Sequence, residues 1–276
     1  MSSSAKKIFI KSLTYIITVI IVIIILFPIY WVFTISIKAQ VDAFAMPPKW
    51  IFKPDWRNYI QIWRTAGFAE AFRNSIIIVA IGTVLALLIS IPSAYAMDRI
   101  KFKGKRLYSA WLLIAYMFPE FLFIIPMYIL WQRIGLYDTY FGVAFVYQVI
   151  QVPFCTWLLQ AFFKEIPTEL EDAAKIDGCN RLQTLLKIYL PLAAPGVSAC
   201  AILCGIWIWN EVPITLAMTF SSAKTVTIAA AGFRGYGSIN WGLMSAASMV
   251  SIVPMLIFAA FAQKYIVEGL TLGSIK

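Results

Sequence analysis

Six apolar runs of membrane-spanning length divide this 276-residue chain. They cover residues 13–35, 75–97, 108–131, 141–163, 195–220 and 242–263. A helix needs about 20 apolar residues to cross a bilayer, so each run is long enough for one span. Only 13% of the residues are charged, whereas a soluble domain carries roughly 25%. The sequence therefore predicts an all-α integral membrane protein, with six transmembrane helices in a single transmembrane domain covering residues 1–276.

Each of these runs contains at least one proline. Membrane helices tolerate proline where neighbouring groups satisfy the freed backbone, so we expect kinks at these positions. The prolines within the runs are Pro28, Pro92, Pro119, Pro126, Pro153, Pro213 and Pro254. The first run follows three lysines but is too long for a signal peptide and lacks a small-residue cleavage site, so we expect an uncleaved first span.

The connection between the second and third runs sets the orientation. Five of the nine residues from Asp98 to Arg106 are Lys or Arg, and such loops stay on the cytoplasmic side. Both termini and the polar segment 164–191 then also lie in the cytoplasm. The segments 38–73 and 221–241 face outward, and the first of these carries aromatic residues suited to the membrane interface.

The residue types of the chain exclude more classes of function than its net charge does. The formal net charge is +10, but the basic residues are dispersed and no nucleic-acid-binding module is present. There is no histidine, which removes the commonest general base and a frequent metal ligand. The four cysteines form no CxxC pair, so we interpret them as small buried side chains.

The polar segment 164–191 has the signals of a short helix outside the bilayer. Pro167 and Thr168 mark its start, with Thr168 and Glu171 spaced as a capping box. Gly178 is a natural helix end. A second periodic stretch then leads back to the membrane at Pro191.

Two alanines characterise this short helix. Ala173 and Ala174 fall on one predicted face together with Leu170 and Asp177. If that face is exposed, small side chains let the backbone of another protein approach closely. Alternatively, the helix packs only on its own protein. The residues by themselves leave both readings open.

The same segment resembles the EAA loop of binding-protein-dependent ABC importer permeases. The resemblance rests on Glu171-Asp172-Ala173-Ala174-Lys175-Ile176-Asp177-Gly178 and on Ile188-Tyr189-Leu190-Pro191-Leu192 with Pro195. Asp172 stands where the family usually has Glu. Trp209-Asn210-Glu211, Trp56-Arg57-Asn58-Tyr59, Asn74-Ser75, Pro48 and the tail 263–276 extend the resemblance over nearly the whole chain, and the tail is similar to that of carbohydrate importers such as the maltose system.

This resemblance implies a type I ABC importer permease fold and a transport subunit that is not an enzyme. It implies a coupling helix that contacts a separate ATPase through Glu171, Asp172, Ala173, Ala174, Asp177 and Gly178. It places Glu268, Gly269, Thr271, Gly273 and Lys276 of the tail against the same ATPase. The chain has no GxxxxGK[ST] phosphate loop, so ATP and Mg would be bound by the partner and no cofactor by this chain.

The implied partners are a second homologous permease forming a heterodimer, two copies of an ABC ATPase subunit and an extracytoplasmic substrate-binding protein. The lipid bilayer surrounds the assembly, and no nucleic acid is expected. The outer segment 221–241 is the candidate contact with the binding protein. The substrate would be a sugar or an oligosaccharide, although similar permeases carry polyols and glycerol phosphate esters.

Polar residues inside spans are costly and are therefore candidates for the substrate pathway. The candidates are Glu120, Gln148, Gln151, Trp209, Asn210 and Glu211, with Trp207 on the same helical face as the last two. These residues could equally form hydrogen bonds between helices. Two other functions stay open at this point: an ion-coupled secondary transporter or channel that works without an ATPase, and an intramembrane enzyme.

Overall fold

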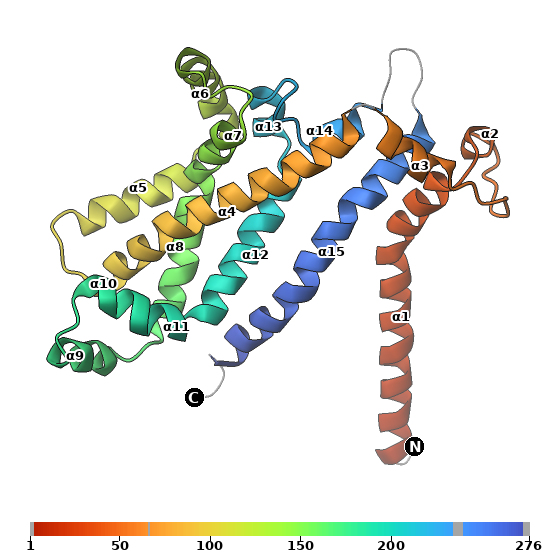
Figure 1. Ribbon diagram of the computed structural model, residues 1–276. Coiled ribbons are helices and arrows are strands. Elements are labelled where there is room, and N and C mark those ends of the chain that lie inside the picture. Colours follow the sequence, from red (N-terminus) through yellow and green to blue (C-terminus); the bar gives the residue numbers. More distant parts are fainter. Residues whose placement is uncertain (1–2, 66, 234–239, 273–276) are drawn as a thin grey trace. The chain divides into compact units, whose positions relative to one another are not determined.

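The structure is a computed structural model that describes residues 3–65, 67–233 and 240–272. Every regular element in these ranges is a helix (Figure 1), which confirms the all-α prediction. Three helices are long and apolar enough to cross a membrane by themselves, within Phe9–Ser36, Phe68–Arg99 and Trp241–Phe261. Three bent helix pairs raise the number to as many as six, if each pair forms one span.

The chain divides into two compact units, Met1–Phe68 with Ala230–Val250 and Ala69–Ala229 with Ser251–Lys276. The first unit contains the helices α1 (Ser3–Ser36), α2 (Gln40–Ala43) and α3 (Arg57–Arg64), with the first part of α15 (Trp241–Leu272). The limits given above for the six spans stay predictions, and so does the single transmembrane domain over residues 1–276.

In the first unit, the predicted outer segment packs on the end of α1. The Asn58 side chain donates to the backbone carbonyls of Ser36 at 2.9 Å and Lys38 at 3.4 Å. The Tyr59 hydroxyl pairs with the Ser36 hydroxyl at 2.8 Å. Lys38 is buried, with its ammonium 5.0 Å from the centre of the Trp31 ring. These contacts of Asn58 and Tyr59 fix the connection that follows the first helix.

The second unit contains most of the helices. They are α4 (Phe68–Arg99), α5 (Lys105–Met117), α6 (Glu120–Ile134), α7 (Tyr140–Val146), α8 (Gln148–Lys164), α9 (Thr168–Ile176), α10 (Arg181–Thr184), the π-helical turn η1 (Leu185–Tyr189), α11 (Leu190–Leu192), α12 (Ala194–Asn210), α13 (Pro213–Met218) and α14 (Val226–Ala231). In Figure 1, α9 to α11 lie at one end of this unit, and α6, α7, α13 and α14 lie at the other. Within this unit, the predicted inward segment 164–191 and the start of the predicted outward segment 221–241 thus lie at opposite ends.

The third predicted span, residues 108–131, is broken into α5 and α6 with a bend of 95°. The break follows from Pro119, because a proline disfavours the helical conformation in the residue before it. Phe118 accordingly has an extended backbone, with ψ at 128°. The fifth predicted span, residues 195–220, also breaks, with α12 ending at Asn210 and α13 starting on Pro213.

Candidate functional site

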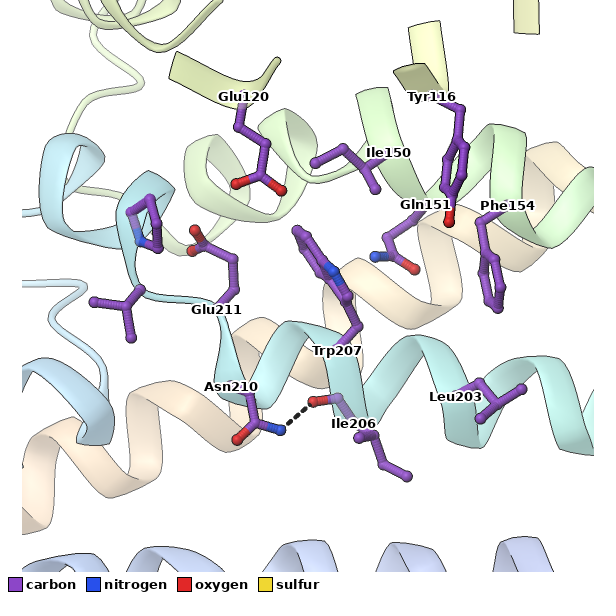
Figure 2. Close-up of a pocket in the computed structure, with 12 residues that line it drawn as sticks. Tyr116, Glu120, Ile150, Gln151, Phe154, Leu203, Ile206, Trp207, Asn210 and Glu211 are labelled. Carbon is purple, nitrogen blue, oxygen red and sulfur yellow. Dashed lines mark hydrogen bonds between the residues drawn. The ribbon is translucent and has the colours of Figure 1, made fainter. Parts of the chain in front are cut away.

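A cavity of about 540 Å³ lies among α5, α6, α8 and α12 in the second unit. Figure 2 shows the side chains that surround it. They are Tyr116, Glu120, Ile150, Gln151, Phe154, Leu203, Ile206, Trp207, Asn210, Glu211, Val212 and Pro213. The breaks in the third and fifth predicted spans supply both glutamates, because Glu120 begins α6 and Glu211 directly follows α12.

The carboxyl group of Glu211 closes the gap between α12 and α13. It accepts hydrogen bonds from the backbone N–H of Ile214 at 2.5 Å and of Thr215 at 3.0 Å, at the start of α13. It also accepts from the hydroxyls of Thr215 and Tyr147, each at 3.0 Å. The first N–H groups of a helix have no partner within the helix, and Glu211 supplies one. Its buried carboxyl is therefore committed to holding the break.

Two other polar side chains face the cavity with unused hydrogen-bonding capacity. Gln151 is 1% exposed, and its side-chain carbonyl oxygen has no hydrogen-bond partner in the described residues. Glu120 is half-buried, and among the described residues its carboxyl group has no hydrogen bond or ion pair. Buried polar groups are nearly always hydrogen-bonded, so this oxygen at the cavity wall leaves a place for a hydrogen-bond donor.

Three aromatic rings complete the wall. Tyr116, Phe154 and Trp207 line the cavity, and Trp207 packs edge-on against Tyr147 with ring centres 5.6 Å apart. Sequence reasoning placed Trp207 on the face of Asn210, but it missed Tyr116 and Phe154. Phe154 follows Gln151 by three residues on α8, so helical spacing could have indicated it.

Two of the predicted pathway residues lie elsewhere. Gln148 is buried and donates to the backbone carbonyls of Ala144 at 2.7 Å and Gly82 at 3.1 Å. Trp209 is buried and donates to the carbonyl of Ser251 at 3.0 Å, beside a separate apolar cavity of about 410 Å³. Both side chains join helices within the protein. Asn210 does line the first cavity, with its amide nitrogen bonded to the carbonyl of Ile206 at 2.7 Å (Figure 2).

The predicted short helix is present as α9, but its start differs from the prediction. The residue that caps its N-terminus is Pro167, and no side chain caps it. The Thr168–Glu171 capping box is therefore wrong, because Thr168 already lies inside the first turn. A capping box does form at the next helix, where Asn180 and Gln183 bond each other's backbone N–H groups.

Gly178 ends α9 as expected. Its φ is +78°, a value that glycine adopts without strain. The N–H of Cys179 bonds the carbonyl of Ala174 at 2.9 Å, and the N–H of Gly178 bonds that of Lys175 at 3.1 Å. This pair of bonds is a Schellman motif.

The two alanines of α9 lie on different faces, so the prediction that they share one face is wrong. Ala174 is 2% exposed and faces the protein, whereas Ala173 is exposed. The outward face also carries Asp172 and Ile176, and Ile176 is 87% exposed. Ala173 and Ile176 stand three residues apart, so they are neighbours on this outward face. Sequence reasoning missed Ile176, although it follows Asp172 by four residues.

Tyr189 connects α9 to the long helices. It is fully buried, and its hydroxyl donates to the Glu171 carboxylate at 3.3 Å. Its ring packs against Tyr95 of α4 at 5.0 Å and Phe163 of α8 at 5.7 Å between ring centres. The guanidinium of Arg99 lies 5.2 Å from the same ring centre. A displacement of α9 would therefore move the side chain of Tyr189, which contacts both α4 and α8.

At the opposite end of the unit, Asp138 holds the segment 220–223. Its carboxylate accepts from the backbone N–H groups of these four residues at 2.9–3.1 Å. Burial acts to raise the pKa of Asp138, but the four N–H groups together outweigh it and hold the pKa at about 2. The fixed carboxylate anchors the start of the outer segment 221–241.

Asn74 and Ser75, part of the motif noted in the sequence, hold the same segment from α4. The Asn74 amide donates to the carbonyls of Ser222 and Lys224, each at 3.0 Å. The Ser75 hydroxyl accepts from the N–H of Val226 at 2.8 Å. Residues 234–239 of the outer segment lie outside the described residues, as do Gly273 and Lys276 of the tail. For Glu268, Gly269 and Thr271, only their place in the backbone of α15 is described.

Comparison with known proteins gives a consistent result. Residues 86–271 match the family described as binding-protein-dependent transport system inner membrane component. The chain is 37% identical over 258 residues to the trehalose/maltose transport system permease protein MalG of Thermococcus litoralis, covering 92% of each chain. It is 37% identical over 257 residues to the trehalose transport system permease protein SugB of Mycobacterium tuberculosis, covering 91% of this chain and 92% of that one.

The fold is also similar to a solved structure. A chain of a bacterial ABC transporter involved in the import of the acidic polysaccharide alginate superposes with a TM-score of 0.77 at 23% identity, covering 96% of this chain and 99% of that one. This likeness supports the ABC importer permease fold. The protein therefore belongs to the family of inner-membrane components of binding-protein-dependent transport systems, in the branch of carbohydrate-importer permeases.

Proposed function

We propose that this chain is one of two permease subunits of an ATP-driven importer for a neutral, hydroxyl-rich solute such as a sugar or an oligosaccharide. The cavity bounded by Glu120, Gln151 and Trp207 forms part of its translocation pathway. The unpartnered amide oxygen of Gln151 carries this proposal, because a hydroxyl of the solute would satisfy it. Relatives named for trehalose and maltose support the same class of solute.

The charge of the cavity favours a neutral solute over an acidic one. Its charged lining residues in the described chain are Glu120 and Glu211, and no Lys or Arg lines it. Phosphate, sulfonate and uronate groups are recognised by cations, with Arg giving paired hydrogen bonds. The aromatic rings of Tyr116 and Trp207 suit the apolar faces of a sugar ring, and carboxyl and amide groups suit its hydroxyls.

Driving force comes from a separate ATPase that binds ATP and Mg. The outward face of α9, formed by Asp172, Ala173 and Ile176, docks on that ATPase, and Tyr189 passes its movement to α4 and α8. This divides the residues that were predicted to contact the ATPase. Glu171 and Ala174 hold α9 against the permease, and the outward residues contact the ATPase. An extracytoplasmic binding protein delivers the solute at the segment 221–241.

Affinity purification in a mild detergent tests this assembly. The tagged chain is expected to bring down a second permease and an ATPase with a phosphate-binding loop. In proteoliposomes with the cognate binding protein, uptake is expected to require ATP on the ATPase side. Recovery of the chain alone, with uptake driven by an ion gradient, would support an ion-coupled transporter and contradict the proposal.

The cavity needs a separate test. Gln151→Leu keeps the size of the side chain and removes the orphaned oxygen, so we expect uptake to fall about tenfold while ATPase binding is unchanged. Ile150→Leu is the matched control, since it neighbours Gln151 on the cavity wall and changes no polar group. Equal uptake in the two variants would remove the cavity from the pathway.

A further inference from the structure

A second concave surface lies at the α9 end of the second unit, where α5 begins and α8 ends. It is a groove of about 710 Å³ between α5 and α8, two helices that contact each other. Three of its lining residues are cations: Lys105 and Arg106 from the first turn of α5, and Lys164 from the last residue of α8. Ser109 and Gln160 add polar groups between them.

The positive charge of this groove is not balanced. No carboxylate is among its lining residues in the described part of the chain. No ion pair of Lys105, Arg106 or Lys164 occurs among the described salt bridges. Arg99 on the neighbouring end of α4 shows the contrast, because it pairs with Asp98 at 2.7 Å. Three converging cations without a counter-charge leave room for an anionic ligand.

The surface beside the groove is apolar. Leu113 of α5 lines the groove, and Met117 follows it one turn later on the same face of the helix. Their exposed fractions are 42% and 71%. The cations of the groove thus lie at the end of an exposed apolar stripe, and Trp157 of α8 lines the groove as an aromatic residue of the kind found at headgroup level.

We propose that this groove binds the headgroup of an anionic phospholipid of the cytoplasmic leaflet, such as phosphatidylglycerol. The phosphate accepts from Lys105, Arg106 and Lys164, and the acyl chains lie along Leu113 and Met117. Basic pockets between helices at the cytoplasmic side are suited to such headgroups. The continuity of cations with exposed apolar side chains favours a lipid over a soluble anion, which would need only the cations.

The site lies next to the seat of α9. The Arg99 guanidinium donates to the backbone carbonyls of Phe163 and Ile166, on either side of Lys164. A lipid bound at Lys164 would therefore stabilise the end of α8, from which the connection to α9 departs. The lipid site is independent of the solute and of the ATPase contact proposed above.

Native mass spectrometry of the full-length protein in detergent tests the proposal, with dioleoyl phosphatidylglycerol as the probe. The groove variant is Lys105→Gln with Lys164→Gln. The matched control is Lys101→Gln with Lys103→Gln, which removes the same charge from two exposed lysines just before α5 that do not line the groove. Each cation near an anionic lipid contributes roughly a fivefold change in affinity, so the groove variant is expected to bind about 25-fold more weakly.

The control is expected to keep wild-type affinity, and phosphatidylcholine is expected to bind both variants and the wild type equally weakly. Thermal unfolding of each variant in detergent shows that the fold is retained. Equal loss in the groove and control variants would overturn the proposal, because it would reduce the effect to net charge. Displacement of the lipid by millimolar inorganic phosphate would assign the groove to a soluble anion. If the lipid does not bind to the importer that contains its ATPase, the groove is assigned to an acidic protein surface instead of a lipid.

Discussion

Aspartate substitutions at Ala173 and Ala174 separate the folding of α9 from its docking. The two positions are adjacent on one helix, so the intrinsic cost of Asp in a helix, roughly 0.6 kcal/mol, is the same at both. Ala174 is 2% exposed, so its substitution buries a carboxyl group without a designed partner. Ala173 is exposed, so its substitution leaves the new carboxylate in water.

The difference in stability follows from these environments. Burying an unpaired polar group costs about 2 kcal/mol or more, and overpacking adds about 1 kcal/mol. We therefore expect Ala174→Asp to destabilise the seat of α9 by ~3 kcal/mol. Ala173→Asp is expected to change the free energy of unfolding by less than about 1 kcal/mol. Its effect should fall on the partner, because a charged side chain replaces the small one at the contact.

The assays are thermal unfolding of the purified protein and ATP-driven uptake by the reconstituted importer. Ala173→Asp is expected to keep the wild-type unfolding temperature and to lose at least about 90% of uptake, a tenfold effect that corresponds to about 1.4 kcal/mol at the docking surface. Ala173→Ser is the control, since it stays small and uncharged. Normal uptake by Ala173→Asp would refute the assignment of this face to the ATPase. Wild-type stability of Ala174→Asp would refute the seating of α9.

Three further expectations follow from other contacts. Glu211→Ala should lower the free energy of unfolding by about 3 kcal/mol, because the donors of α13 and Tyr147 lose their acceptor at ~1 kcal/mol or more each. A shift of the unfolding temperature by less than 2 °C corresponds to about a fraction of a kcal/mol, and such a small shift would contradict the capping role. The pKa of Asp138 is about 2 in the folded protein and 3.8 ordinarily. The ionised carboxylate therefore stabilises the fold fully above about pH 4, and this stabilisation is lost as the pH falls towards 2. Asp138→Asn should remove this pH dependence of the free energy of unfolding between pH 5 and pH 2, and an unchanged profile would refute the anchoring role of Asp138. Gly178→Ala should cost about 1 kcal/mol from its positive φ alone, because no atom lies within 4 Å of the added Cβ, and a loss above 3 kcal/mol would indicate a clash that the structure does not contain.

Much of the helical framework could be predicted from the sequence because apolar run length directly limits where membrane helices lie. Gly178 was predictable for a similar reason, since a positive φ favours glycine. The inner and outer faces of α9 were not predictable, because they depend on where Tyr189 sits, fifteen residues after Ala174 in the chain. Periodicity places Ala173 and Ala174 100° apart, but it cannot say which of them meets the protein.

The sequence predicts the types of residue that line the substrate cavity, but not which individual residues line it. Polar groups in apolar runs pointed to Glu120, Gln151 and Glu211, all of which line the cavity. The same rule selected Gln148, which bonds to backbone carbonyls instead. The hydrogen-bond partner of a buried side chain comes from another helix, and its position is set by the bends at Pro119 and Glu211. The sequence predicts that such bends occur, but not their angles.

A photocrosslink from position 176 tests the central claim most directly. The exposed Ile176 is replaced by benzoyl-phenylalanine in the intact importer, and the same replacement at Leu107, an exposed residue of α5, is the control. We expect illumination to join position 176 to an ATPase subunit and position 107 to no ATPase subunit. An active importer in which position 176 forms no crosslink to an ATPase would contradict the account of α9 as the coupling helix.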